Sequence, residues 1–192
     1  MILPLMSKQA IKTKMDLSIV DFIFRENSEF VTRTSKEIFS GKRVVIFALP
    51  GAFTPTCTKQ QLPGFEAVYD EIRALNVDEV YCLSVNDAFV MNAWFDSLGI
   101  TKVKALPDGN GTFTVAAGMA VQKTNLGFAT RSWRYAIVVD NGILEWSGVE
   151  EGRRDNASDD PYENSTPDRV IQYLQAKRDA DAQVQTKEAV PA

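Results

Sequence analysis

The sequence predicts an α/β fold in which helices cover both faces of a mixed central sheet. Two apolar runs, 44–49 and 79–85, have the composition of strands buried on both faces, and a segment with helical periodicity follows each. A third apolar run, 133–139, leads through Asn141-Gly142, a hairpin signal, into a strand over 143–149. Crossover helices join parallel strands and tight turns join antiparallel ones, so the sheet is expected to contain both kinds of pairing.

The remaining elements are expected between and after these strands. Apolar residues recur near a period of 3.6 over 56–75, where Thr54 or Thr56 is expected to cap the helix and Pro63 to kink it. The others are a helix over 87–96, a strand over 102–106, a turn over 107–111, a short helix over 112–118, a loop over 155–160 and a helix over 167–177. The domain is thus expected to span 16–177, between an N-terminal tail of 1–15 and a frayed C-terminal tail of 178–192.

Composition excludes several classes of function. The chain has 192 residues, a net charge of -4 and no histidine, which excludes a Ser-His-Asp triad, a Cys-His pair and histidine-ligated metals. Two cysteines are too few for a disulfide framework or a four-cysteine zinc site. No apolar run reaches the roughly 18 residues of a membrane span. We therefore expect no cofactor, no metal, no nucleic-acid partner and no membrane association.

The chain is expected in a reducing compartment, the cytoplasm. Two cysteines without a clear secretory signal are typical of such a compartment. The first 15 residues are a weak secretory signal, because their apolar part is short and precedes the charged part.

The segment PGAFTPTC, Pro50 to Cys57, joins the first buried strand to the following helix. Cys57 is expected in the first helical turn, where unpaired N–H groups and the helix dipole favour an anion. Such a position lowers a cysteine pKa without the help of histidine, and the resulting thiolate is a nucleophile. Placement alone does not separate a reactive cysteine from a buried structural one.

This segment closely resembles the active-site loop of type II peroxiredoxins. The general pattern of peroxiredoxins, Pro-x-x-x-Thr-x-x-Cys, is matched by Pro50, Thr54 and Cys57. The resemblance continues through KQQLPGF, YCLSVNDAFVMNAW, RSWRYAIVVDNG and DPYENSTPDRV, and covers about 16–175. It implies a thioredoxin-like fold and a thiol-dependent peroxidase, which reduces hydrogen peroxide and alkyl hydroperoxides through a sulfenic acid at Cys57.

The resemblance also implies the roles of individual residues. Thr54 would hydrogen-bond the thiolate and the peroxide, and Pro50 would shield the thiolate from water. The arginine of the family directly precedes an aromatic residue, which selects Arg134 over Arg131. If one strand reaches both arginines, alternation puts them on opposite faces, so that only one can face Cys57.

Cys82 is a possible resolving cysteine, because some type II peroxiredoxins have one assigned at this place in the strand. By strand rise it lies roughly 10 Å below the top of the sheet, whereas a disulfide needs Cα atoms within about 7 Å. A disulfide with Cys57 would therefore require the helix start to unwind. A resolving role and a buried structural role both stay open.

If Cys82 does not resolve, an external thiol must reduce the sulfenic acid. The resemblance suggests glutathione with glutaredoxin, or thioredoxin, as the reductant, and it suggests a homodimer that pairs near the active site.

Two other classes of function are weighed against a peroxidase. A monothiol disulfide oxidoreductase would share the architecture, but the second cysteine of a Cys-x-x-Cys motif is missing, since Thr54 stands three residues before Cys57. A peroxide sensor would use oxidation of Cys57 as a signal. Repeated turnover of peroxide with a thiol donor separates a peroxidase from both.

Overall fold

A computed structural model describes residues 20–188 of the protein, with side chains as far as Val184. Its central sheet has five strands in the order β5-β4-β3-β8-β9. These strands are β3 (Arg43–Leu49), β4 (Glu79–Ser84), β5 (Lys104–Pro107), β8 (Tyr135–Asp140) and β9 (Ile143–Val149). β3, β4 and β5 pair in parallel, whereas β8 is antiparallel to both β3 and β9. The predicted mixed sheet is confirmed.

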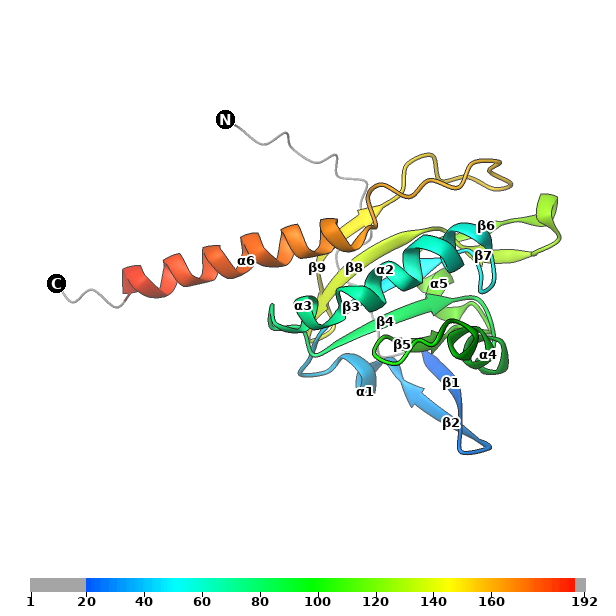
Figure 1. Ribbon diagram of the computed structural model, residues 1–192, viewed down its shortest axis with the longest axis horizontal. Coiled ribbons are helices and arrows are strands. Elements are labelled where there is room, and N and C mark those ends of the chain that lie inside the picture. Colours follow the sequence, from blue (N-terminus) through cyan, green and yellow to red (C-terminus); the bar gives the residue numbers. More distant parts are fainter. Residues whose placement is uncertain (1–19, 189–192) are drawn as a thin grey trace.

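Both faces of the sheet are buried, because successive side chains of the central strand β3 point to opposite sides. One face is covered by the helices α2, α3, α4 and α6, whose bounds are given below (Figure 1). On this face β3 contributes the side chains of Val45, Phe47 and Leu49, which pack against these helices. Val44, Ile46 and Ala48 pack on the other face, against β1, α1 and α5. Continuous burial explains why β3 has the sequence of an uninterrupted apolar run.

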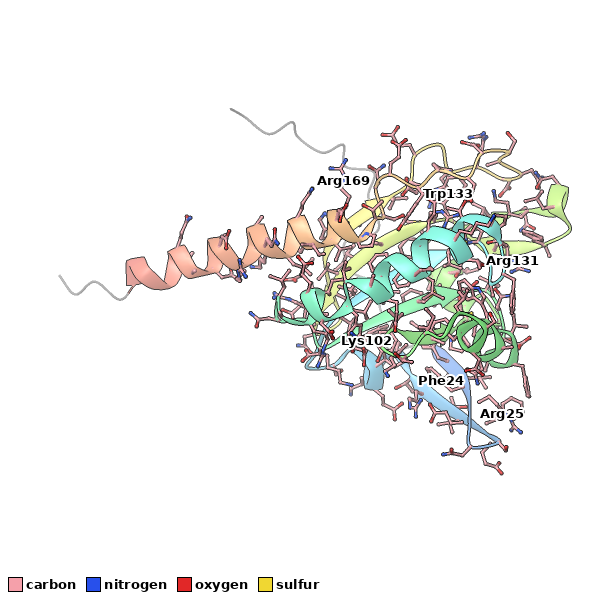
Figure 2. All side chains as sticks on the ribbon, in the orientation of Figure 1. Phe24, Arg25, Lys102, Arg131, Trp133 and Arg169 are labelled. Carbon is pink, nitrogen blue, oxygen red and sulfur yellow. The ribbon has the colours of Figure 1, made fainter. Side chains whose placement is uncertain are left out.

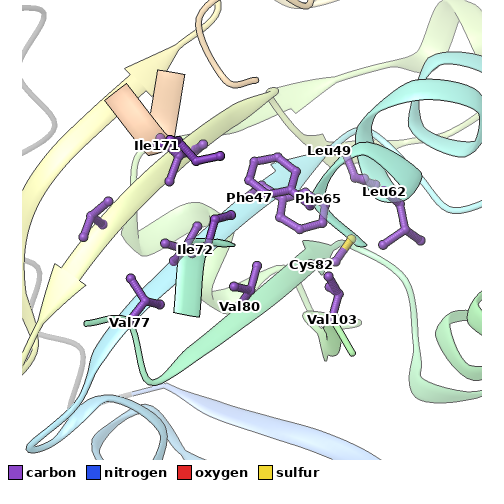
Figure 3. Packing of buried hydrophobic residues seen from close by; sticks show 14 of the residues in the cluster. Phe47, Leu49, Leu62, Phe65, Ile72, Val77, Val80, Cys82, Val103 and Ile171 are labelled. Carbon is purple, nitrogen blue, oxygen red and sulfur yellow. The ribbon is translucent and has the colours of Figure 1, made fainter. Parts of the chain in front are cut away.

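An aromatic pair ties the first of these layers to the sheet. The ring of Phe47 in β3 stacks on that of Phe65 in α2, with centroids 4.0 Å apart and planes 3° apart (Figure 3). Both side chains are fully buried. The helix that follows the PGAFTPTC segment is thereby fixed against the central strand.

The helix predicted over 56–75 is divided into three parts. A π-helical turn, η2 (Cys57–Gln61), leads into α2 (Leu62–Ala67), and a break at Val68 separates α2 from α3 (Tyr69–Arg73). Pro63 has no N–H, and the wide turn before it, where Leu62 N donates to Cys57 O, accommodates the missing donor.

The predicted side-chain cap of this helix is wrong. Thr56 has helical dihedral angles, φ −64° and ψ −40°, and makes no capping bond. The Thr54 hydroxyl is used elsewhere, because it donates to the Gly51 carbonyl.

Two hairpins and a short helix are present that the sequence did not predict. The first hairpin consists of β1 (Asp21–Glu26) and β2 (Glu29–Thr34), and α1 (Ser35–Phe39) follows it with a capping box between Thr34 and Glu37. The second consists of β6 (Ala120–Gln122) and β7 (Thr130–Ser132). Most side chains of the first hairpin are at least partly exposed, so it lacks the clear apolar alternation by which a strand is recognised.

The other predicted helices are present. Asp87 caps α4 (Ala88–Leu98), as expected, and α5 is Thr112–Ala116. The last helix, α6 (Pro167–Glu188), continues well beyond the predicted end at 177, and its far part extends away from the rest of the structure (Figure 1). The prediction of a frayed tail from 178 is therefore wrong for 178–188, which are helical. The predicted N-terminal tail of 1–15 lies outside the described residues. None of the helices within 20–188 is both long and apolar enough to span a bilayer.

Candidate active site

The thiol of Cys57 is fully buried at the start of the helix that follows β3. The chain enters this helix through Pro50–Thr56, and Thr58 N donates to Thr54 O at 2.9 Å in its first turn. Cys57 belongs to the apolar cluster that includes Phe47 and Leu62. The position predicted for Cys57, in the first helical turn, is thus observed.

Arg134 brings a buried positive charge to this thiol. The residue is 1% exposed, and its Nη1 donates to Cys57 Sγ at 3.4 Å and also to Gln61 Oε1. On the other side Nη2 donates to Asp160 Oδ1 at 2.5 Å. Burial lowers the pKa of Arg134, but the negative charges of Cys57 and Asp160 outweigh burial and raise it. The side chain is therefore a cation at every physiological pH.

The argument that strand alternation separates the two arginines does not hold, although Arg134, which the resemblance to the family selects, is the arginine that contacts Cys57. β7 ends at Ser132 and β8 begins at Tyr135, so Arg131 and Arg134 do not share a strand. Arg134 lies in the irregular connection between the two strands. That connection, rather than alternation, directs its side chain to the thiol.

Arg131 lies close by and braces the loop before Cys57. Its Nη1 is 3.4 Å from Pro50 O and 3.3 Å from Asn86 Oδ1, at the same end of the molecule as the start of η2 (Figure 2). Asn86 Oδ1 also accepts from Ala52 N at 3.0 Å. A Cβ on Gly51 would lie 3.0 Å from Arg131 Nη1, so this contact favours glycine there. Arg131 and Asn86 thereby hold the loop in place.

Thr54 and Pro50 lie in this loop as the sequence pattern requires. The half-buried Thr54 hydroxyl donates to Gly51 O at 2.8 Å. Because a hydroxyl has one hydrogen, Thr54 does not donate to the Cys57 thiolate in this arrangement, but its oxygen can still accept a hydrogen bond. Pro50 is buried and directly follows β3.

Three residues that the sequence did not single out complete the surroundings of Arg134. Gln61 is fully buried, and its Nε2 is 3.5 Å from Ala48 O. Its position four residues after Cys57 on one helix is the signal that could have found it. Asp160 and Tyr162 come from the loop before α6, with the Tyr162 ring centroid 5.7 Å from Arg134 Cζ. Both residues lie in the block DPYENSTPDRV, whose resemblance to the family is the signal that could have found them.

Cys82 lies in the middle of β4, opposite Phe47 in the parallel pairing. Both cysteines are free and buried, and Cys82 packs among apolar side chains (Figure 3). Burial raises the pKa of the Cys82 thiol well above its usual range, and the negative charge of Cys57 adds to this effect. Cys82 is therefore a protonated thiol at neutral pH.

A mixed sheet with a buried thiol at a helix start, next to a buried arginine, defines an enzyme of the thioredoxin-like fold that works through a cysteine. The Redoxin family profile matches residues 18–164. Peroxiredoxin y4vD of Sinorhizobium fredii is 57% identical over 142 residues, which are 74% of this chain and 76% of that protein.

Two solved structures resemble this one. The Plasmodium falciparum antioxidant protein, a 1-Cys peroxiredoxin, has a TM-score of 0.78 and 36% identity, covering 82% of this chain and 94% of its own. Reduced Prx3 of Vibrio vulnificus in complex with hydrogen peroxide has a TM-score of 0.75 and 35% identity, covering 82% and 95%. The chain belongs to the peroxiredoxin family and is a thiol peroxidase, which confirms the family, fold and class of enzyme predicted from the sequence.

Proposed function

We propose that Cys57 is the residue that attacks the peroxide, and that the substrates are hydrogen peroxide and alkyl hydroperoxides. The observation that carries this proposal is the contact of 3.4 Å between the buried Cys57 Sγ and Arg134 Nη1. A guanidinium and the N–H groups of a helix start stabilise a thiolate. The chain has no histidine, so no imidazole can take the proton of the thiol. Stabilisation of the thiolate therefore depends on the guanidinium and these N–H groups.

In the proposed reaction the Cys57 thiolate attacks one oxygen of the hydroperoxide. The S–O bond forms as the O–O bond breaks, and the sulfur is oxidised to sulfenic acid while the peroxide is reduced. The leaving alkoxide or hydroxide takes up a proton and departs as an alcohol or water. Arg134 stabilises the negative charge that develops on the leaving oxygen, as the donors of an oxyanion hole do.

Thr54 and Pro50 have supporting roles in this proposal. The Thr54 hydroxyl gives its hydrogen to Gly51 O, so its oxygen is available to accept the O–H of the hydroperoxide. Pro50 is buried and has no N–H of its own, so it excludes water from the thiol without adding a competing donor. Both groups favour attack by the thiolate on peroxide over side reactions with water.

We further propose that an external thiol, rather than Cys82, reduces the sulfenic acid. Thiol–disulfide chemistry needs a thiolate, and burial keeps Cys82 protonated. One thiol would condense with the Cys57 sulfenic acid to release water and form a mixed disulfide. A second thiol would then release the disulfide product and restore Cys57. Glutathione with glutaredoxin, or thioredoxin, are the proposed donors.

A homodimer in the cytoplasm is proposed as the working form. Three phenylalanines have more than half of their residue surface exposed: Phe30, Phe53 and Phe89. Phe30 and Phe89 pack edge to face, 5.8 Å apart, and the Arg25 guanidinium lies over both rings. Exposed aromatic groups of this kind are typical of protein interfaces, and sedimentation equilibrium tests the dimer.

The proposed location in the cytoplasm is supported by the two free, buried cysteines, which suit a reducing compartment. Cell fractionation tests this location.

Peroxide consumption by single-cysteine variants tests the proposed chemistry. Cys57→Ser should abolish turnover with either donor system, whereas Cys82→Ser, a matched change of a buried cysteine, should keep glutathione-supported turnover. A folded Cys82→Ser protein that loses this turnover would contradict external resolution. Consumption of one equivalent only, with ample donor present, would favour a peroxide sensor over a peroxidase.

A further inference from the structure

Asp160 shares the buried arginine with the reactive thiol. Its side chain is 45% exposed, yet Oδ1 accepts from Arg134 Nη2 at 2.5 Å, and Arg134 itself is almost completely buried. Nη1 of the same guanidinium faces Cys57 Sγ. One cation therefore lies between the Cys57 sulfur and the Asp160 carboxylate, and of these three groups only Asp160 has substantial contact with solvent.

The loop that carries Asp160 is held by a buried carboxylate. Glu150, 2% exposed, accepts from Glu163 N at 3.0 Å, Asn164 N at 2.9 Å, and Ser165 N and Oγ at 2.8 and 2.6 Å. Its own N–H donates to Arg134 O at 3.2 Å. The loop is thus anchored to the backbone of Arg134, so the orientation of Asp160 toward the guanidinium is built into the fold.

We propose that Asp160 is a positioning residue, which fixes the Arg134 guanidinium through Nη2 so that Nη1 points at Cys57 Sγ. Its negative charge also limits how strongly the cation stabilises the thiolate. The proposal rests on the proposed role of Cys57. It adds a residue, outside the Pro-x-x-x-Thr-x-x-Cys segment, that sets both the geometry and the charge of the site.

Few charges other than these two act on the Cys57 thiol. Tyr162 and Cys82 also face it, but burial raises the pKa of both groups, so they are neutral at neutral pH. Among the groups that the structure places at the thiol, Arg134 and, through it, Asp160 are the charged ones. The pH profile of Cys57 reactivity should therefore respond to a change at Asp160.

Asp160→Asn keeps an acceptor for Nη2 but removes the charge. The midpoint of the pH profile of Cys57 alkylation by iodoacetamide, followed on the Cys57 peptide by mass spectrometry, should fall by about 0.5 to 1.5 pH units. Asp159→Asn is the matched control, because Asp159 pairs with Arg154 at 2.5 Å where both side chains are about half exposed. The control should leave the midpoint unchanged. An equal midpoint in the two variants would overturn the electrostatic part of the proposal.

Asp160→Ala removes both the charge and the acceptor. The rate constant for oxidation of Cys57 by hydrogen peroxide, corrected for the thiolate fraction, should fall about tenfold or more. Asp160→Asn should restore it to within about threefold, because the bond to Nη2 is kept. An Asp160→Ala protein that is folded and reacts as fast as the original would overturn the positioning role.

These two readouts separate failure of the inference from failure of the proposed function. Alkylation involves no peroxide, so a shifted midpoint together with a Cys57 that peroxide does not oxidise would contradict the proposed function alone.

Discussion

Replacing Arg134 by lysine should slow oxidation of Cys57 by hydrogen peroxide by about 10² to 10³, although the positive charge is kept. The two Nη atoms of Arg134 contact three acceptors, Cys57 Sγ, Gln61 Oε1 and Asp160 Oδ1. Lysine carries a single ammonium group at the end of a flexible chain, which acts as a point charge. It cannot donate to Asp160 on one side and to the thiol on the other in the geometry of a guanidinium.

The magnitude follows from the contacts that would be lost. One donor aimed at a charge that develops in the transition state contributes about 2.7 to 4 kcal/mol, which is the factor just given. Arg134→Ala also leaves Gln61 Oε1 buried without its donor, and an unpaired buried acceptor costs about 1 to 3 kcal/mol of stability. Arg134→Ala should therefore lower both the rate of Cys57 oxidation and the free energy of unfolding. Arg134→Lys should lower mainly the rate of Cys57 oxidation.

Stopped-flow fluorescence is suited to this measurement. The Trp94 indole donates to Thr58 Oγ1 at 3.1 Å, next to Cys57, so its emission should report oxidation of the thiol. Arg131→Lys is the matched control, since Arg131 contacts Pro50 O and Asn86 but not the sulfur. A rate for Arg134→Lys within about threefold of the original would refute the reasoning. A larger loss in Arg131→Lys than in Arg134→Lys would transfer the role to Arg131.

Three further predictions concern the loop, the core and the acid side of stability. Thr54→Val should slow oxidation of Cys57 by hydrogen peroxide about tenfold or more, whereas Thr54→Ser, which keeps the hydroxyl, should not. If stopped flow gives the same oxidation rate for the two variants, the hydroxyl has no role in the reaction. Phe65→Ala should lower the free energy of unfolding by about 3 to 5 kcal/mol in urea titrations, because the stacked ring on Phe47 is lost; a loss below about 1 kcal/mol would contradict the packing. Burial raises the pKa of Glu66, but hydrogen bonds from the N–H groups of 101–103 outweigh it and lower the pKa. A lowered folded pKa contributes stability above the unfolded value, which is lost as pH falls through the folded value. The Glu66→Gln variant should therefore be less stable than the original at pH 7, and the difference should shrink as pH falls below the ordinary glutamate pKa of about 4.3; a difference that does not change with pH would argue against this linkage.

The elements that the sequence predicted well are those whose burial leaves a local pattern. β3 and β4 are buried on both faces, so their apolar runs mark them within about a residue. The position of Cys57 follows from the Pro50-Gly51 boundary and the helical period after it. The resemblance to a family, rather than physical reasoning, selected Thr54 and Arg134.

Other features depend on contacts between distant parts of the chain, which leave no local signal. Asp160 reaches Arg134 across 26 positions, and an acidic loop has the same composition whether or not it folds over a cation. The end of α6 was misplaced because its last turns have few large apolar residues, yet residues that favour helices and the pair Lys177–Asp181 continue the helix into solvent. The π-turn at Cys57 combines a missing N–H at Pro63 with packing that periodicity does not reveal.

Intact mass after one equivalent of hydrogen peroxide, without any thiol donor, tests most directly whether Cys57 is the reactive sulfur. The account predicts a gain of one oxygen atom, located at Cys57 by peptide mapping, retained in Cys82→Ser and absent in Cys57→Ser. An oxygen located at Cys82, or a loss of two hydrogens that joins the two cysteines at once, would contradict it.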